Sequence, residues 1–270
     1  MTESVTENHP DLWHDKLPGP KPNGHKYDRG HAVIFAATDL TGATRLAAEA
    51  CSRIGAGLVT VLATRRDDVY RTALPPDIMV SEDTLDNVRN PTALLGGCGG
   101  LAPTQHNELY LRLENCTRVF DADAIPAQED RGVLDSNCIL TPHDGEFAKA
   151  FPDMEGDRVS KAQDAARASG ATVVVKGRET VTAAPDGRFN INTHASPWLA
   201  KAGTGDVLAG MIAGLAAQGM EPFDAASAAA WMHGEAGRRI GPGLIAGDIS
   251  AHLREILHEL FDQNENLAAS

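Results

Sequence analysis

Positive charge, cysteine and long apolar runs are all scarce in this sequence. Lys and Arg total 24 against 37 Asp and Glu, so the formal net charge is −13. This balance argues against nucleic acid or an anionic membrane surface as partner, because both bind basic faces. Phosphate ligands stay possible, since backbone N–H groups and one or two cations hold them locally. No run approaches about 18 apolar residues, so no membrane span is expected.

The four cysteines show no CxxC pair and no zinc-type spacing. We therefore expect four reduced thiols, as is usual for a protein of a reducing compartment. The stretch from Met1 to Pro10 is polar and acidic and contains no apolar core, so no signal peptide is expected. Together these features predict a cytoplasmic protein.

The chain length of 270 residues suits one large α/β domain. Residues 1–23 are expected to form a flexible arm, because they begin polar and acidic and then carry three closely spaced prolines. Residues 24–262 show no linker, low-complexity tract or repeat, and we expect them to form the domain itself. Residues 263–270 are expected to be a loose C-terminal tail.

Short apolar runs, suited to buried strands, alternate with helical patterns along most of the chain. The expected strands are 31–36, 57–62, 92–95, 117–120, 138–140 and 172–175, with a hairpin over 181–184 and 188–192. The expected helices include 42–53, 204–218, 222–239 and 248–260. Near-continuous apolar strands separated by helices indicate a mostly parallel sheet covered on both faces. The prediction is an α/β fold, a three-layer α/β/α sandwich.

The sharpest motif is Gly203-Thr204-Gly205-Asp206, which precedes a run of small apolar residues. The glycines permit a tight turn, and the free N–H groups at the start of the following helix form an anion hole. A carboxylate at this position is a candidate base, able to take a proton from a hydroxyl that attacks a phosphoryl group. The alternative is an ordinary helix start, capped by Thr204 or Asp206.

A second motif, Thr141-Pro142-His143-Asp144-Gly145-Glu146, directly follows the apolar run 138–140. It places an imidazole and a carboxylate at the carboxyl end of a strand, where open α/β sheets bind ligands. His143 is a candidate substrate contact. Glu146 is a candidate to position a magnesium–phosphate complex through water. The alternative is a turn with Glu146 in the first turn of a helix.

Three further polar or glycine-rich segments follow expected strands. They are Lys176-Gly177 after 172–175, Asp121 and Asp123 after 117–120, and the cluster Gly96-Gly97-Cys98-Gly99-Gly100 after 92–95. A lysine can reach a phosphate as a point charge, and glycines allow close backbone approach. Each segment alone is ambiguous. Because all of them lie at carboxyl ends of expected strands, we predict that they share one cleft.

Taken together, these segments resemble the ADP/ATP-dependent NAD(P)H-hydrate dehydratases, a ribokinase-like family. The resemblance runs from about Gly24 to Leu260. The matching motifs are Gly24-His25-Lys26, Gly30-His31, Thr41-Gly42-Ala43, Ile54-Gly55-Ala56-Gly57, Asp121-Ala122-Asp123-Ala124, the 140–146 and 176–177 segments, Gly203 to Gly210, and His233-Gly234-Glu235. Single glycine motifs are common, but this order and spacing is specific.

The resemblance implies that ATP or ADP phosphorylates the 6-hydroxyl of hydrated NADH or NADPH, and that phosphate loss restores the reduced cofactor. Asp206 would be the base, with Gly203, Thr204 and Gly205 as the anion hole. Positions implied for the nucleotide are Lys176, Gly177, Thr180 and Gly205; those for the substrate are Ala43, Gly100, His143 and Asp206. Mg²⁺ is implied as the partner of the nucleotide, with Glu146 acting through water. A homo-oligomer, a tetramer by the same resemblance, is expected.

The sequence departs from the family pattern at ligand-facing loops. Ala36-Ala37-Thr38 replaces a Gly-Gly pair, Gly96-Gly97-Cys98 replaces Gly-Pro-Gly, and His194-Ala195-Ser196-Pro197-Trp198 replaces Thr-Gly-Asn-Pro-Gly. Lys201 stands where a small residue is common. Two other readings therefore stay open: a ribokinase-like kinase of a small vitamin-precursor alcohol, and a nucleotide-binding protein without turnover.

Overall fold

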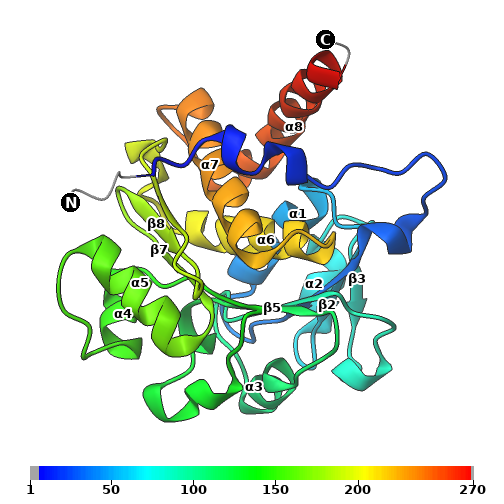
Figure 1. The fold of residues 1–270 in the computed structure, drawn as a ribbon. Helices are drawn as coiled ribbons and strands as arrows, with labels where there is room; N and C mark the ends of the chain where they lie inside the picture. The colour runs from blue at the N-terminus through cyan, green and yellow to red at the C-terminus, as the bar shows by residue number, and fades with distance from the viewer. Residues whose placement is uncertain (1–5, 269–270) are drawn as a thin grey trace.

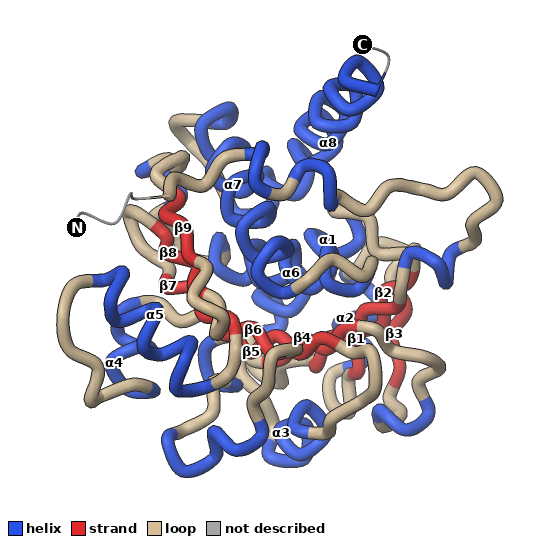
Figure 2. Tube along the Cα trace, in the orientation of Figure 1, coloured by secondary structure: helices blue, strands red, loops and turns tan. Residues whose placement is uncertain are grey.

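The computed structural model describes residues 6–268, and its centre is a nine-stranded sheet (Figure 2). The strands are β1 (His31–Phe35), β2 (Leu58–Leu62), β3 (Met79–Ser81), β4 (Ala93–Gly96), β5 (Thr117–Phe120), β6 (Cys138–Leu140), β7 (Thr172–Val175), β8 (Thr180–Ala183) and β9 (Phe189–Asn192). Their order is β3-β2-β1-β4-β5-β6-β7-β8-β9. Strands β1 to β7 pair with one another in parallel. The hairpin of β8 and β9 adds two antiparallel strands at one edge.

The predicted sandwich is confirmed, with helices on both faces of the sheet (Figure 1). The helices are α1 (Thr41–Arg53), α2 (Asp67–Ala73), α3 (Pro103–Tyr110), α4 (Asp144–Ala150), α5 (Arg158–Ser169), α6 (Thr204–Ala217), α7 (Pro222–Ile240) and α8 (Ala246–Ala268). One face carries α1, α6, α7 and α8, and the other carries α3, α4 and α5. The central strands are largely apolar because both faces are covered, and every residue of β1 and β7 is buried.

Close packing of α6 on α1 fixes the helix that carries the predicted base. A Cβ on Gly210 would lie 2.1 Å from the carbonyl oxygen of Ala47, and one on Gly214 would lie 2.7 Å from that of Cys51. Only glycine permits this approach, so the small-residue run of α6 is a packing requirement. The N-terminus of α6 is thereby held beside the carboxyl ends of the parallel strands.

The N-terminal segment is not the flexible arm that its composition predicts, as far as the described residues show. Trp13 is fully buried and its ring lies 5.9 Å from that of Trp231. The side-chain amide of the buried Asn8 donates to Oδ1 of Asn192 and to the carbonyl of Ser227, and His14 Nε2 lies 2.6 Å from the carbonyl oxygen of Leu260. Buried apolar area and satisfied polar groups outweigh the prolines, which lie farther along. Residues 1–5 lie outside the described part.

The C-terminal boundary also differs from the prediction. α8 continues to Ala268, past the tail boundary expected at residue 262. Residues 269 and 270 lie outside the described part. Among residues 6–268, no helix combines the length and the apolar character that a membrane span requires.

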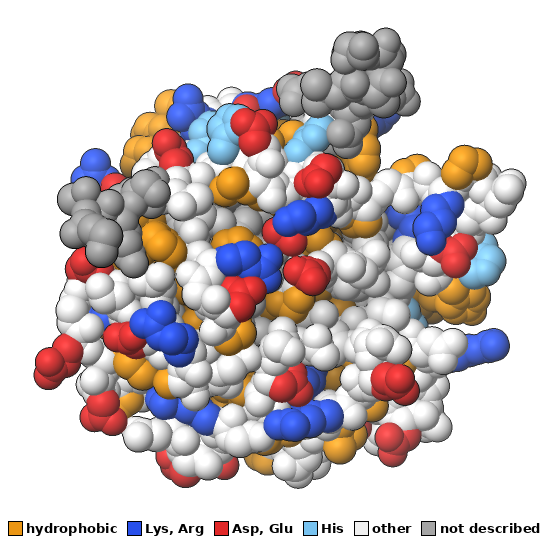
Figure 3. Space-filling view, in the orientation of Figure 1, with side chains coloured by type: hydrophobic (Ala, Val, Ile, Leu, Met, Phe, Trp, Pro, Cys, Tyr) orange, Lys and Arg blue, Asp and Glu red, His pale blue; other side chains and the backbone are white. Residues whose placement is uncertain are grey.

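The surface agrees with the charge balance of the sequence. On the face shown in Figure 3, Lys and Arg side chains are interspersed with Asp and Glu, and no continuous basic patch covers that face. This face therefore lacks the electrostatic footprint of a nucleic-acid-binding surface.

Candidate functional site

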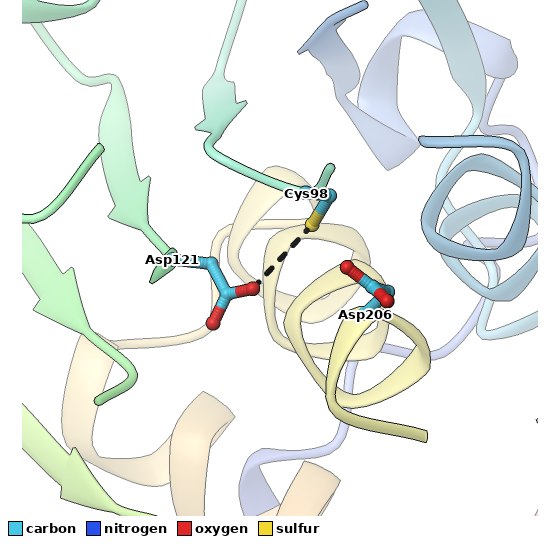
Figure 4. A group of neighbouring side chains, drawn as sticks. All are labelled: Cys98, Asp121 and Asp206. Carbon is cyan, nitrogen blue, oxygen red and sulfur yellow. Dashed lines mark hydrogen bonds between the residues drawn. The ribbon is translucent and has the colours of Figure 1, made fainter. Parts of the chain in front are cut away.

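The predicted cleft residues meet where β4, β5 and β7 end and α6 begins. Cys98 follows β4, Asp121 follows β5, Lys176 follows β7, and Asp206 lies in the first turn of α6. One oxygen of each aspartate and Sγ of Cys98 all lie within 4.8 Å of one another. Figure 4 shows the three side chains pointing toward the same small space. The carboxyl edge of a parallel sheet is where α/β proteins bind ligands.

Asp121 is buried and fully engaged by partners. Its Oδ1 accepts a hydrogen bond from Lys176 Nζ at 2.6 Å and another from Thr141 Oγ1 at 2.6 Å. Burial opposes the charged ammonium, but the adjacent carboxylate outweighs it and raises the pKa of Lys176 above its usual value. Lys176 therefore reaches the site as predicted, with its charge already balanced by Asp121.

Asp206 is in the opposite situation. Its side chain is half-buried, and no described cation forms an ion pair with it. Burial, followed by the nearby Asp121 carboxylate, raises the pKa of Asp206 to about 6, while Lys176 and the Cys98 thiol partly oppose the rise. A carboxylate with this pKa is ionised at neutral pH and still accepts a proton readily, which suits a general base.

The first turn of α6 offers N–H donors beside this carboxylate. Gly203 precedes the helix in the left-handed region, with φ +91°. The hydroxyl of Thr204 donates to the carbonyls of Leu199 and Lys201, so it does not cap the helix amides. The N–H of Gly205 donates to no backbone carbonyl among residues 6–268. The alternative that Thr204 is an ordinary cap is therefore wrong.

Lys176 and the α6 amides face one space. A Cβ on Gly205 would lie 3.4 Å from Lys176 Nζ. The ammonium and the positive end of the helix dipole thus act together on any group placed there. The predicted anion-binding character of this site follows from that geometry.

His143 and Glu146 form the N-terminal cap of α4. His143 Nδ1 accepts from the N–H groups of Gly145 and Glu146, at 2.9 and 3.3 Å. Glu146 Oε2 accepts from the N–H of His143 at 2.8 Å, and its Oε1 lies 3.2 Å from His143 Nε2. A β-bridge pairs His143 with Lys176, which places the cap beside the site. The helix-start interpretation of this motif is confirmed, and the ligand roles of His143 and Glu146 stay predictions.

Loop residues implied for the substrate lie next to one another. A Cβ on Gly99 would lie 2.9 Å from the Cβ of Ala43, and one on Gly100 would lie 4.0 Å from Asp123 Oδ2. Thr44 Oγ1 donates to the carbonyl of Cys98 at 3.0 Å, which ties the start of α1 to the glycine-rich loop. The structure thus brings Ala43 and Gly100 to the loop that carries Cys98.

Arg158, which was not predicted from the sequence, supports the loop implied for the nucleotide. A Cβ on Gly177 would lie 2.3 Å from Nη1 of Arg158, so the guanidinium packs directly against this glycine. Nη1 donates to the carbonyl of Lys176 at 3.2 Å and is 3.5 Å from that of Glu179, just before Thr180. Nη2 donates to Asp144 at 2.5 Å. An arginine at the start of α5, far from any motif, gives no local signal of this role.

The unusual loop at 194–201 has structural partners. His194 stacks on Trp231, with ring centroids 4.7 Å apart, and its Nε2 lies 2.7 Å from Glu235 Oε2. Lys201 Nζ donates to the carbonyl of Leu244 at 2.9 Å. Trp198 keeps 48% of its surface exposed. These departures from the family pattern therefore fold into a defined loop beside the anion hole.

The donor set of Cys98, Asp121 and Asp206 fits Mg²⁺ poorly as a direct ligand set. Mg²⁺ requires oxygen ligands in near-octahedral geometry, whereas one donor here is a buried thiol. Asp121 is already paired with Lys176. A magnesium ion in this region would instead be held by phosphate oxygens and water, which is consistent with the indirect role predicted for Glu146.

Comparison with known proteins places this geometry in a family. The family model described as NAD(P)H-hydrate dehydratase matches residues 32–258. The ADP-dependent (S)-NAD(P)H-hydrate dehydratase of Neisseria meningitidis is 34% identical over 249 residues, which cover 83% of this chain and 83% of that protein. A bifunctional NAD(P)H-hydrate repair enzyme of Moorella thermoacetica is 35% identical over 94% of this chain. The match covers 54% of that enzyme, so the chain spans about half the length of this bifunctional relative.

Solved structures agree. The ADP/ATP-dependent NAD(P)H-hydrate dehydratase of Bacillus subtilis, co-crystallised with ATP/Mg²⁺, superposes with a TM-score of 0.84 at 25% identity and covers 96% of this chain and 100% of its own. A ribokinase-like protein of Enterococcus faecalis shares the fold, with a TM-score of 0.82 at 23% identity, covering 96% of this chain and 98% of its own. The ribokinase-like prediction is confirmed, and the chain belongs to the NAD(P)H-hydrate dehydratase family.

Proposed function

We propose that this protein uses ADP or ATP to restore NADH and NADPH from their hydrates. The observation that carries the proposal is Asp206, a carboxylate with a pKa of about 6 in the first turn of α6. Family membership and the activities named for the Neisseria and Bacillus relatives support the choice of substrate and nucleotide.

The reaction begins with phosphoryl transfer to the 6-hydroxyl of the hydrate. The hydroxyl oxygen bonds to the terminal phosphorus of the nucleotide as its proton passes to Asp206, and the bond from that phosphorus to the bridging oxygen breaks. The N–H groups of 203–206 and the ammonium of Lys176 stabilise the charge on the transferring group. Afterwards the lone pair of the ring nitrogen expels phosphate from C6, and loss of a proton from C5 restores the double bond.

We assign binding roles to residues near the carboxyl ends of the parallel strands and the start of α6. Lys176, Gly177, Thr180 and Gly205 are proposed to hold the nucleotide; Ala43, Gly100 and His143 are proposed to contact the substrate with Asp206. Glu146 is proposed to hold a hydrated Mg²⁺ through water, and such an ion would supply positive charge to the phosphates of the nucleotide.

Three further expectations stay proposals. We propose a homo-oligomer, specifically a tetramer, which light scattering on the purified protein tests. We propose a cytoplasmic location, consistent with four buried free thiols. We propose that residues 24–262 are the catalytic domain, with the packed N-terminal segment contributing to its stability.

The direct test incubates the protein with chemically hydrated NADH, Mg²⁺ and either ADP or ATP. Return of the absorbance band of reduced nicotinamide supports the proposal. Nucleotide consumption with a stable phosphorylated alcohol supports the small-molecule kinase instead. Binding of nucleotide with neither outcome identifies a protein without turnover.

A further inference from the structure

Cys98 is a side chain that the proposed reaction does not use, although it lies at the reaction centre. It ends the segment Gly96-Gly97-Cys98, which stands where the family pattern has Gly-Pro-Gly. Its Sγ lies 3.8 Å from Asp121 Oδ2, with a carboxylate oxygen of Asp206 within the same 4.8 Å group (Figure 4). The thiol is buried, with 1% exposure.

The backbone holds this thiol in a fixed position. Gly97 has φ +107°, and a Cβ there would lie 1.7 Å from the carbonyl oxygen of Asp121. Gly99 has φ +84°, and a Cβ there would lie 2.5 Å from the carbonyl oxygen of Leu40. Thr44 fixes the carbonyl of Cys98 from α1. Because each neighbour is constrained, the loop holds the backbone of Cys98 beside the two carboxylates.

The charges around the thiol leave one of the two carboxylates, Asp206, without an ion-pair partner among the described residues. Lys176 bonds Asp121, and the described ion pairs include none to Asp206. The other ionisable groups near this space act at longer range: Glu146 of α4 acts on Lys176, Asp123 lies beside Gly100, and the neutral, buried His233 of α7 contacts the carbonyl of Thr204. The S–H group of Cys98 is therefore an uncharged donor close to both Asp121 and Asp206.

The thiol stays protonated under working conditions. Burial and then the carboxylates of Asp121 and Asp206 raise the pKa of Cys98 well above its usual value. A protonated thiol is a weak hydrogen-bond donor and not a nucleophile. Donation to a carboxylate favours its ionised form.

We infer that Cys98 sets the pH range in which Asp206 accepts a proton, by donating its S–H into the space shared by Asp121 and Asp206. It is a positioning residue, since it acts through Asp206 and keeps its own proton throughout. While Asp206 is ionised, the thiol stabilises the pair of negative charges; once Asp206 carries the substrate proton, the thiol donates to Asp121 alone. This inference rests on the proposed function for its kinetic consequence.

The kinetic test compares pH profiles of turnover for the wild type, Cys98→Val and Cys98→Ser. Valine fills a similar volume without a donor, so the acid limb is expected to move up by about half a pH unit, with activity at about pH 5.5 falling a further two- to threefold relative to the plateau. Serine restores a donor and is expected to leave the limb at or below its wild-type position. Coincident limbs for all three proteins overturn the inference.

A spectroscopic test does not depend on turnover. The S–H stretching band of Cys98, identified by its loss in Cys98→Ala, is followed by infrared spectroscopy as the pH is varied. The band is expected to shift with a midpoint near the Asp206 pKa of about 6 and to stop shifting in Asp206→Asn. A band that is independent of pH in the wild type overturns the inference. Absence of turnover together with the expected shift rejects the proposed function alone.

Discussion

Asp121 and Asp206 face the same small space, yet the fold gives them opposite chemical roles. Asp121 is buried against a lysine and a threonine hydroxyl, each 2.6 Å away. Asp206 has no such ion pair among the described residues, and its pKa rises to about 6 because it is half-buried near another negative charge. Two carboxylates with such different partners can divide structural and acid–base work between them. The difference lies in their partners, not in the residue type.

The strongest challenge to this comparison is Asp206→Asn. The amide is isosteric and cannot accept the hydroxyl proton, so turnover is expected to fall by about 10³-fold. Nucleotide affinity is expected to change little, because the α6 amides and Lys176 remain. Turnover of hydrated NADH and calorimetric nucleotide binding measure the two effects. Turnover close to the wild-type rate would rule out Asp206 as the base.

The ion pair of Asp121 and Lys176 provides the next test, because substituting its two members is expected to shift the pKa of Asp206 in opposite directions. Asp121→Asn removes a negative charge and is expected to lower the pKa of Asp206, whereas Lys176→Met removes a positive charge and is expected to raise it. Each leaves a buried partner alone and is expected to cost about 2–4 kcal/mol of unfolding free energy. Denaturant unfolding and the acid limb of the pH profile give the values. Shifts in the same direction would contradict the charge assignment.

The raised pKa of Asp206 also has a consequence for stability. Its folded-state value of about 6 lies above the usual unfolded value of about 3.9, so the folded protein binds the proton more tightly between these pH values. The contribution of Asp206 to the free energy of unfolding is therefore fully present below about pH 4 and is lost as the pH rises through 6. The loss is expected to be about 2 kcal/mol.

The measurement compares unfolding free energies of the wild type and Asp206→Asn across this range. As the pH rises from about 4 to 7.5, the unfolding free energy of Asp206→Asn is expected to increase by about 2 kcal/mol relative to that of the wild type, because the variant has no carboxylate to ionise at this position. A constant difference between the two proteins across the range would show that Asp206 titrates normally.

Much of the fold could be predicted from the sequence because the central strands are apolar on both faces. The 117–120, 138–140 and 172–175 runs are strands with those same bounds. β3 (Met79–Ser81) was not predicted, because it is a three-residue edge strand in which Met79 is exposed and no residue is fully buried. Trp13 was assigned to a flexible arm because its burial depends on distant residues of α7.

The site likewise contains residues that a local motif identifies and others whose position depends on distant parts of the chain. Asp206 and the glycines of its turn are adjacent in the sequence, so a local motif could identify them. The pairing of Lys176 with Asp121 joins residues 55 positions apart, and the position of Cys98 depends on three separate loops meeting at the sheet edge. Such contacts are set by strand order, which no local pattern specifies.

The smallest expected effect concerns Glu146→Gln, which separates the cap of α4 from a role with magnesium. Glutamine can still accept the N–H of His143, as in other capping boxes, so the unfolding free energy is expected to change by less than about 0.5 kcal/mol. If Glu146 orients a hydrated Mg²⁺, losing its charge raises the Mg²⁺ concentration for half-maximal turnover several-fold. His143→Asn keeps a capping side chain and the Glu146 charge, and serves as the matched control. An unchanged Mg²⁺ requirement in Glu146→Gln would leave Glu146 as a helix cap only.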